Sequence, residues 1–182
     1  MKSKLVPVWS LAISTLLIFC VTVQISGAET KEHTWGKVSF KTPIAFSSPQ
    51  EIGLDAVALL HPPESGLGKA QMEITLVAVP KDMQESMGNK DAEIMSYVKA
   101  TFLASTLPAA KSVERSFLGR KVTGEAQSSS IPKPGELELY LIPLSGGDKV
   151  AVGFKRDNAM PKDKAESVIN TVAQSFKEIK AQ

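Results

Sequence analysis

Three segments of this sequence place large apolar side chains at every second position. They are residues 72–78, 136–141 and 149–155. A strand projects successive side chains to opposite faces of a sheet, so this spacing predicts strands in a sheet buried on one side. Residues 145–148, with two adjacent glycines, join the last two strands as a hairpin turn. The chain therefore needs a hydrophobic layer to cover an antiparallel sheet.

Weaker patterns predict further strands, and proline and glycine clusters predict the loops between them. The additional strands are expected at residues 37–41, 44–47, 54–60, 112–118 and 121–127, the last two as a hairpin around Gly119 and Arg120. The loops lie at residues 61–68 and 128–135. Because loops carry recognition while a sheet supplies rigidity, these two loops are the expected places for a partner site.

Two segments change to the helical period. Ile94, Met95, Val98 and Phe102 predict a helix over residues 90–105, and residues 81–88 are expected to add only a loose turn. A second helix begins near Pro161 and carries an apolar stripe of Ala165, Val168, Ile169, Val172, Phe176 and Ile179. The predicted fold class is α+β, an antiparallel β-sheet with helices packed on it, forming a single domain over residues 37–182.

The first 28 residues have the three parts of a secretory signal peptide. Lys2 and Lys4 precede an uncharged stretch of 24 residues that ends at Ala28. Its apolar centre, residues 11–23, suits a cleaved leader, whereas the whole stretch is long enough for an uncleaved anchor, since about 20 residues cross a bilayer. The prediction is a signal peptide over residues 1–28 and a polar lead-in over residues 29–36, with no membrane insertion after cleavage.

Removal of the leader changes what the chain can bind. It takes away Cys20, the single cysteine, and leaves 19 basic and 19 acidic residues. The mature chain therefore has no disulfide or thiolate, and it lacks the concentrated positive charge that nucleic acids require. Export predicts a periplasmic or secreted protein.

Two short motifs match nucleotide or hydrolase signatures incompletely. Ser96 and Lys99 have the Ser-x-x-Lys spacing of serine penicillin-interacting enzymes, but the companion motifs are missing and both residues are expected on a solvated helix face. Gly66, Gly68 and Lys69 suggest a phosphate loop, but Ala70 stands where a Ser or Thr would bind magnesium. The second motif is therefore interpreted as a hairpin loop.

Histidines and paired carboxylates are the remaining candidates. His33 lies in the predicted lead-in. His61 ends a strand close to Glu64 and Ser65, with Asp55 on the same strand. One histidine with one nearby carboxylate is too small a set for a closed metal site, so no metal or cofactor is predicted. Glu136 and Glu138 share one strand face and are interpreted as solvated residues of an exposed sheet face. No catalytic residue is predicted.

Two segments carry a resemblance to a known family. Residues 38–43, Val-Ser-Phe-Lys-Thr-Pro, and residues 165–177, which include Val168-Ile169 and Ser175-Phe176, resemble the PsbP-like family. That family is named for an extrinsic photosystem II subunit and includes many exported bacterial proteins. The resemblance implies an α/β/α sandwich and a noncatalytic binding or assembly role. The leader differs from a chloroplast transit peptide, so a photosystem subunit is not expected.

The leading hypothesis is an exported, noncatalytic accessory protein with a protein partner at the outer face of a bacterial inner membrane. One alternative is a small hydrolase-like or metal-dependent enzyme whose site forms only in three dimensions. His61 gathered with two carboxylates, or Ser96 beside an accessible Lys99, would favour that enzyme. Another alternative is a membrane-tethered accessory domain that keeps its leader as an anchor.

Mass spectrometry of the protein purified from the exported fraction tests the leader. We expect an intact mass that lacks residues 1–28 and a first residue of Glu29, because small residues stand at the cleavage positions before it. A membrane-bound product with the full precursor mass would instead indicate the uncleaved anchor.

Overall fold

Ten strands and three helices form the part of the chain that this computed structural model describes, residues 30–104, 111–129 and 133–179. The strands are β1 (Lys31–Trp35), β2 (Val38–Thr42), β3 (Gln50–Gly53), β4 (Ala56–His61), β5 (Met72–Val79), β6 (Lys111–Phe117), β7 (Arg120–Ser129), β8 (Gly135–Pro143), β9 (Lys149–Asp157) and β10 (Lys177–Glu178). The helices are α1 (Lys81–Ser86), α2 (Asp91–Phe102) and α3 (Lys162–Ser175). The predicted signal peptide lies outside the described residues.

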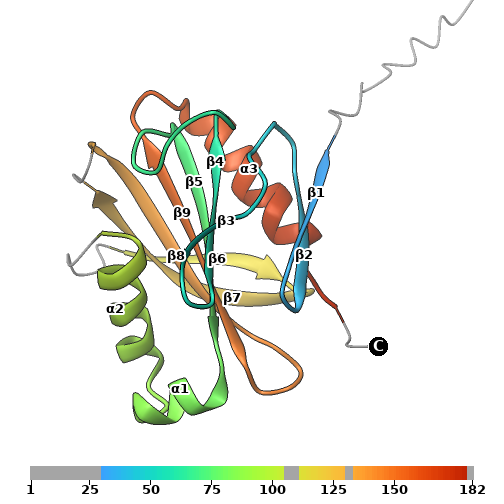
Figure 1. The fold of residues 1–182 in the computed structure, drawn as a ribbon, viewed down its shortest axis with the longest axis vertical. Helices are drawn as coiled ribbons and strands as arrows, with labels where there is room; N and C mark the ends of the chain where they lie inside the picture. Colours follow the sequence, from blue (N-terminus) through green and yellow to red (C-terminus); the bar gives the residue numbers. More distant parts are fainter. Residues whose placement is uncertain (1–29, 105–110, 130–132, 180–182) are drawn as a thin grey trace, which may run out of the picture.

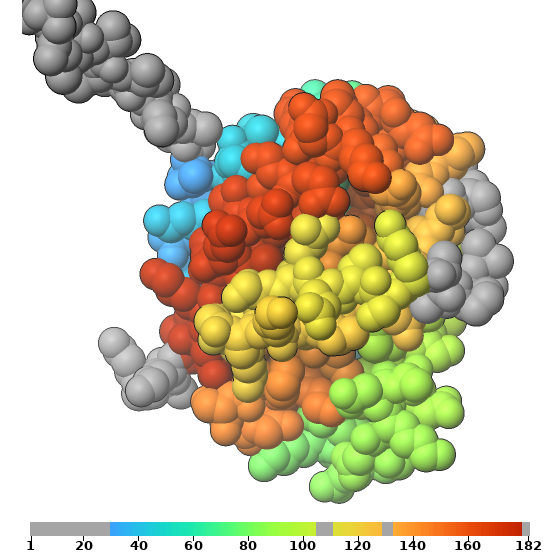
Figure 2. Space-filling view, turned by 180° about the vertical axis from the view of Figure 1, so that it is seen from behind, coloured from blue at the N-terminus to red at the C-terminus, as the bar shows by residue number. Residues whose placement is uncertain are grey.

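The strands form two antiparallel sheets (Figure 1). The larger sheet has seven strands in the order β3-β4-β5-β9-β8-β7-β6, and the smaller has the order β1-β2-β10. The small sheet and α3 pack on one face of the large sheet, and α2 packs on the other. Seen from behind, α3 lies between the β1–β2 hairpin and β6 (Figure 2). The α+β class with an antiparallel sheet and packed helices is confirmed.

The central strands of the large sheet are buried on both faces, so the prediction of a sheet buried on one side is wrong for them. In β5, Ile74 and Leu76 belong to the core under α3, whereas Val77 belongs to the core under α2. Thr75, expected to point away from the core, is 3% exposed. The cause is that α2 covers the face opposite α3, which places the central strands between two layers.

The strongest sequence patterns gave correct elements. Helix α2 and helix α3 lie where the helical period predicts them, and β8 and β9 form the predicted hairpin. The β6–β7 hairpin is present, but its turn lies one residue earlier than predicted, because Phe117 pairs with Arg120. The turn residues are Leu118 and Gly119, which have φ values of 53° and 72°. This pair of left-handed residues is typical of the tight turns that match strand twist.

Four local predictions are wrong. Residues 31–35 of the predicted lead-in form β1, and residues 81–86 form α1 rather than a loose turn. Residues 44–47 form no strand; β3 lies at residues 50–53 instead. Helix α3 ends at Ser175, and Ile179, assigned to its stripe, is 38% exposed beyond it. The errors at the two ends of the described chain lie where backbone pairing with β2, by β1 and by β10, outweighs the local pattern.

Among the residues that the structure describes, no helix is both long enough and apolar enough to cross a bilayer.

His33 shows how β1 joins the core. It is 4% exposed, and its ring stacks on Phe40 with centroids 5.5 Å apart. Its Nε2 lies 3.1 Å from Oγ1 of Thr42. Because that hydroxyl donates to the carbonyl of Ile44, Nε2 of His33 is the donor to Thr42. Burial, assisted by the charge of Lys31, lowers the pKa of His33.

Acid should therefore weaken the fold through His33. Unfolded His33 gains a proton near its ordinary pKa of 6.5, whereas the folded protein resists protonation until a lower pH. The unfolded state then binds more protons, so the free energy of unfolding should fall as the pH drops below 6.5 and should be unaffected by His33 above it.

Urea unfolding between about pH 7.5 and 5 measures this slope. The His33→Phe variant should show a flatter dependence of unfolding free energy on pH over that range. A variant with the wild-type slope would contradict the assignment to His33.

Candidate functional site

A cleft of about 420 Å³ lies at one end of the large sheet. Its walls come from the β1–β2 turn, the β3–β4 turn, the end of β5 and the β8–β9 turn. Its apolar lining consists of Trp35, Ala56, Val57, Ala78, Val79, Pro80, Leu144 and Val150. Its charged lining consists of Lys37, Glu51, Asp55, Asp148 and Lys149. This volume and this mixture of apolar surface with a few polar groups are typical of ligand-binding sites.

Trp35 supplies the aromatic side chain of the cleft. It is the last residue of β1 and pairs with Val38 across the turn formed by Gly36 and Lys37. Gly36 has a φ of 53°, the left-handed conformation that glycine adopts without strain. Trp35 is partly buried against the core under α3. Its indole is therefore held in place by packing on one side while it lines the cleft on the other.

The β3–β4 turn forms the opposite lip. Gly53 pairs with Ala56, so only Leu54 and Asp55 connect the two strands. Asp55 has a φ of 55°, a conformation that Asp tolerates better than most residues, and its carbonyl accepts a hydrogen bond from the Ala78 amide at 2.8 Å. This bond fixes the turn to β5. Leu54, at the tip, is 92% exposed.

Ion pairs join the turns that surround the cleft. Lys37 Nζ lies 2.6 Å from Oδ2 of Asp148, and this hydrogen bond raises the pKa of Lys37 and lowers the pKa of Asp148. Glu178 accepts hydrogen bonds from the Ser145 hydroxyl at 2.7 Å and amide at 2.9 Å, which lower the pKa of Glu178. Because these groups are near the surface, their effect is mainly to position the turns rather than to stabilise the fold.

The charges of the cleft do not balance. Lys149 pairs with Asp91 at 2.6 Å, just as Lys37 pairs with Asp148. Within the described part of the chain, Glu51 and Asp55 have no cation within 4.0 Å. The rim therefore carries two carboxylates whose charge is not neutralised by an ion pair.

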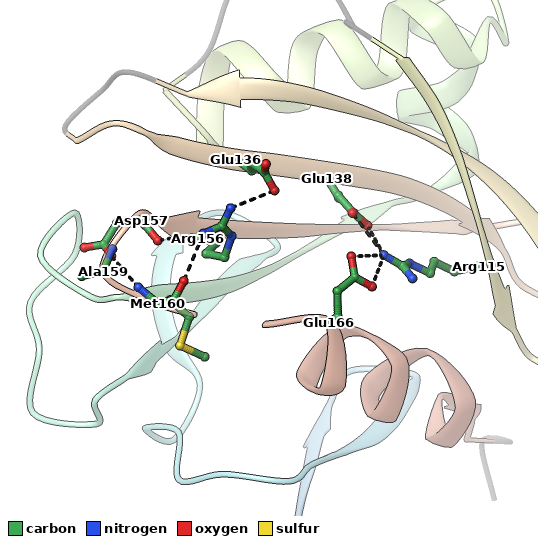
Figure 3. A network of polar contacts seen from close by, with 8 residues as sticks. All are labelled: Arg115, Glu136, Glu138, Arg156, Asp157, Ala159, Met160 and Glu166. Carbon is green, nitrogen blue, oxygen red and sulfur yellow. Dashed lines mark hydrogen bonds and ion pairs between the residues drawn. The ribbon is translucent and has the colours of Figure 1, made fainter. Parts of the chain in front are cut away.

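A second polar region, between the large sheet and α3, contains the predicted carboxylate pair (Figure 3). Arg115 lies 3.1 Å from Oε1 of Glu138 and 2.9 Å from Oε2 of Glu166 on α3. It also donates to the Tyr140 hydroxyl at 3.3 Å. That hydroxyl donates to Glu138 at 2.6 Å, and burial together with this bond raises the pKa of Tyr140.

Glu136 has a different arginine. Arg156 Nη2 lies 2.9 Å from its Oε2, and the hydrogen bond lowers the pKa of Glu136. The same arginine donates to the Met160 carbonyl at 3.0 Å. Glu136 and Glu138 share a sheet face as predicted, and the Glu136 side chain is 50% exposed, as expected for a solvated residue. The prediction is wrong for Glu138, whose side chain is only 14% exposed beside α3. Figure 3 shows each carboxylate directed to its own arginine. The geometry is that of structural ion pairs.

The Ser-x-x-Lys match does not form a reactive pair. Ser96 is on the exposed side of α2, whereas Lys99 is 7% exposed. The Lys99 ammonium lies 2.6 Å from Oε2 of Glu125 on β7. The prediction that both residues share a solvated face is wrong for Lys99, because β7 covers that side of the helix. Because the Lys99 ammonium is held by Glu125 rather than by Ser96, the two residues do not form a nucleophile and base pair.

The candidates around His61 are also separate. His61 and Asp55 stand at opposite ends of β4, about 20 Å apart along a strand of this length. His61 Nδ1 donates to the Ala45 carbonyl at 2.7 Å, and its ring lies against Phe46. The described ranges 30–104, 111–129 and 133–179 contain no group of three His, Cys, Asp or Glu that could hold a metal ion.

The glycine-rich segment after His61 is the predicted hairpin loop between β4 and β5. Its Gly68 amide donates to Glu73 Oε1 at 2.7 Å, so this donor faces a carboxylate rather than an open anion site. This loop and the loop before β8 lie at the end of the sheet opposite the cleft. Residues 130–132 of the second loop fall outside the described residues. Sequence patterns thus pointed to the loops at one end, and the cleft lies at the other.

Comparisons with known proteins reach the fold only. No protein-family model and no curated protein matches this sequence. Among solved structures, the chain is similar to the Ran-binding protein Mog1p of Saccharomyces cerevisiae, with a TM-score of 0.51, 10% identity, and coverage of 84% of this chain and 96% of that chain. A mutant form of Mog1 has a TM-score of 0.49, 10% identity, and coverage of 84% and 97%.

A third solved structure, from Bacteroides thetaiotaomicron, has a TM-score of 0.46 at 10% identity. The match covers 79% of this chain and 45% of that chain, so the chain spans less than half of that protein. The likeness to Mog1p shows a shared α+β fold. The PsbP-like resemblance stays a prediction.

Breaking the Arg115 contact should destabilise the fold. The Arg115→Met variant leaves the Glu138 carboxylate under α3 without its cation, so we expect the free energy of unfolding to fall by about 2–4 kcal/mol. Chemical denaturation measures this change. The matched control is Lys121→Met, which removes a pair with Glu114 whose side chains are 84% and 57% exposed. It should cost less than about 0.5 kcal/mol. Equal losses in the two variants would contradict the structural role of Arg115.

Proposed function

We propose that this protein is an exported, noncatalytic binding protein that contacts a protein partner at the outer face of a bacterial inner membrane. The observation that carries the proposal is the cleft at the end of the large sheet. It combines a tryptophan, an apolar floor and a charged rim, which is the composition of protein contact sites. Export rests on the predicted signal peptide.

The side chains considered for catalysis support a binding role because they already have structural partners. Lys99 is held by Glu125, and Glu138 is held by Arg115. A catalytic acid or base needs an accessible atom within hydrogen-bond reach of its substrate, and these two side chains are largely buried against their own partners. The contacts of the cleft, by contrast, lie at the surface where a partner can reach them.

The comparisons support the same class without naming a partner. Mog1p, which shares the fold, is described as a Ran-binding protein. A shared fold does not transfer a ligand, so this similarity favours a binding role in general and says nothing of Ran here. The PsbP-like resemblance implies the same noncatalytic class.

Site-specific photocrosslinking tests the proposal. Leu54 at the lip of the cleft is replaced by photoreactive benzoylphenylalanine in the full chain, and the cells that export it are irradiated. We expect a covalent adduct with one defined exported protein. The matched control carries the same group at Leu67, which is 54% exposed in the β4–β5 loop at the opposite end of the sheet.

No adduct should form from position 67. The proposal fails if position 54 gives no protein adduct, or if both positions give the same adducts.

A further inference from the structure

We infer that the cleft receives a basic side chain, arginine or lysine, from the partner protein. This inference rests on the proposed function and specifies the chemistry of the same site. It follows from four features of the cleft: the charge of its rim, the position of Trp35, its apolar floor, and the exposed Leu54 at the tip of the β3–β4 turn.

The unpaired negative charges at the rim of the cleft favour a cationic ligand. Lys37 and Lys149 are each held by a carboxylate at 2.6 Å, so an anionic ligand would have to displace Asp148 or Asp91. Glu51 and Asp55, in contrast, have no ion-pair partner in the described residues. An incoming cation gains an attraction there without breaking an existing contact, and complementary charge favours both encounter and specificity.

The strand register places Glu51 and Trp35 on the same side of the large sheet. Glu51 is directly opposite Val57 in the β3–β4 pair, and residues opposite one another project to the same face. Val57 belongs to the core under α3, against which Trp35 also packs. A cation near the indole face gains a further attraction, which is strongest for tryptophan among aromatic side chains. Arginine and lysine are the residues that supply such a cation.

The apolar floor fits the methylene groups of a basic side chain, and the lip at Leu54 fits a neighbouring residue of the partner peptide. Long basic side chains bury their methylene groups on apolar surface and keep the charge at the polar edge, and the floor of the cleft is apolar. Beside the cleft, Leu54 is 92% exposed. One exposed leucine is ordinary, but at this lip it gives a neighbouring apolar residue of the partner a surface to cover. A free amine or guanidine would leave Leu54 in water, so the expected ligand is a peptide segment.

Fluorescence can report directly on the cleft. Of the two tryptophans, Trp9 lies in the predicted leader, so a Trp9→Phe substitution leaves Trp35 as the single tryptophan in the full chain, and excitation that tyrosine does not absorb isolates its emission. The probes are an acetylated hexapeptide with one arginine flanked by leucine, the same peptide with the neutral isostere citrulline in place of arginine, and free arginine amide. Each is titrated while Trp35 emission is recorded, with calorimetry as a second readout.

We expect saturable binding of the arginine peptide, at least about 5-fold tighter than that of the citrulline peptide and of arginine amide. Glu51→Gln and Asp55→Asn should each weaken binding of the arginine peptide by about 3-fold to 10-fold. The matched control is Glu64→Gln, which neutralises an exposed carboxylate at the opposite end of the sheet and should leave binding unchanged.

Each contrary outcome has a distinct meaning. Equal binding of the arginine and citrulline peptides, or no effect of the Glu51 and Asp55 substitutions, overturns this inference while crosslinking from position 54 still supports the proposed function. If arginine amide binds as tightly as the arginine peptide, the claim that the ligand is a peptide segment is wrong. Absence of any crosslink from position 54 overturns the proposed function and this inference with it.

Discussion

The contact of Arg115 with Glu138 and Glu166 links the last helix to two strands of the large sheet. Glu138 belongs to β8 and Glu166 to α3, so one guanidinium from β6 joins three elements. Hydrophobic packing under α3 is not directional, whereas this charged contact has a defined geometry. The helix is therefore fixed in position as well as covered.

The segment that follows α3 helps to form the cleft at the end of the large sheet. After the helix ends, β10 pairs with β2, and the Ile179 amide donates to the Lys37 carbonyl at 2.7 Å. Glu178 then binds Ser145 in the β8–β9 turn. The β1–β2 hairpin, the C-terminal strand and the β8–β9 turn are thus one connected wall, and this wall follows directly on a helix that packs against β2 and β6.

The sequence predicted the elements better than their surroundings. Alternation gave β5, β8 and β9, and the helical period gave α2 and α3, because these patterns are local. It did not show that both sheet faces are buried, since Thr75 and Glu138 are polar and their burial depends on what packs over them. The cleft was missed for a related reason. Its walls come from turns far apart in the chain, and the one local signal was Trp35 followed by a turn glycine.

The placement of the cleft on hairpin ends separates recognition from folding. Leu54 and Asp55 form a two-residue connection, and their side chains take no part in the strand register that holds the sheet. Substitutions in such turns can change which ligand the surface binds while the layered fold stays the same. Chains that retain this architecture at 10% identity, as Mog1p does, are therefore free to have acquired unrelated ligand preferences.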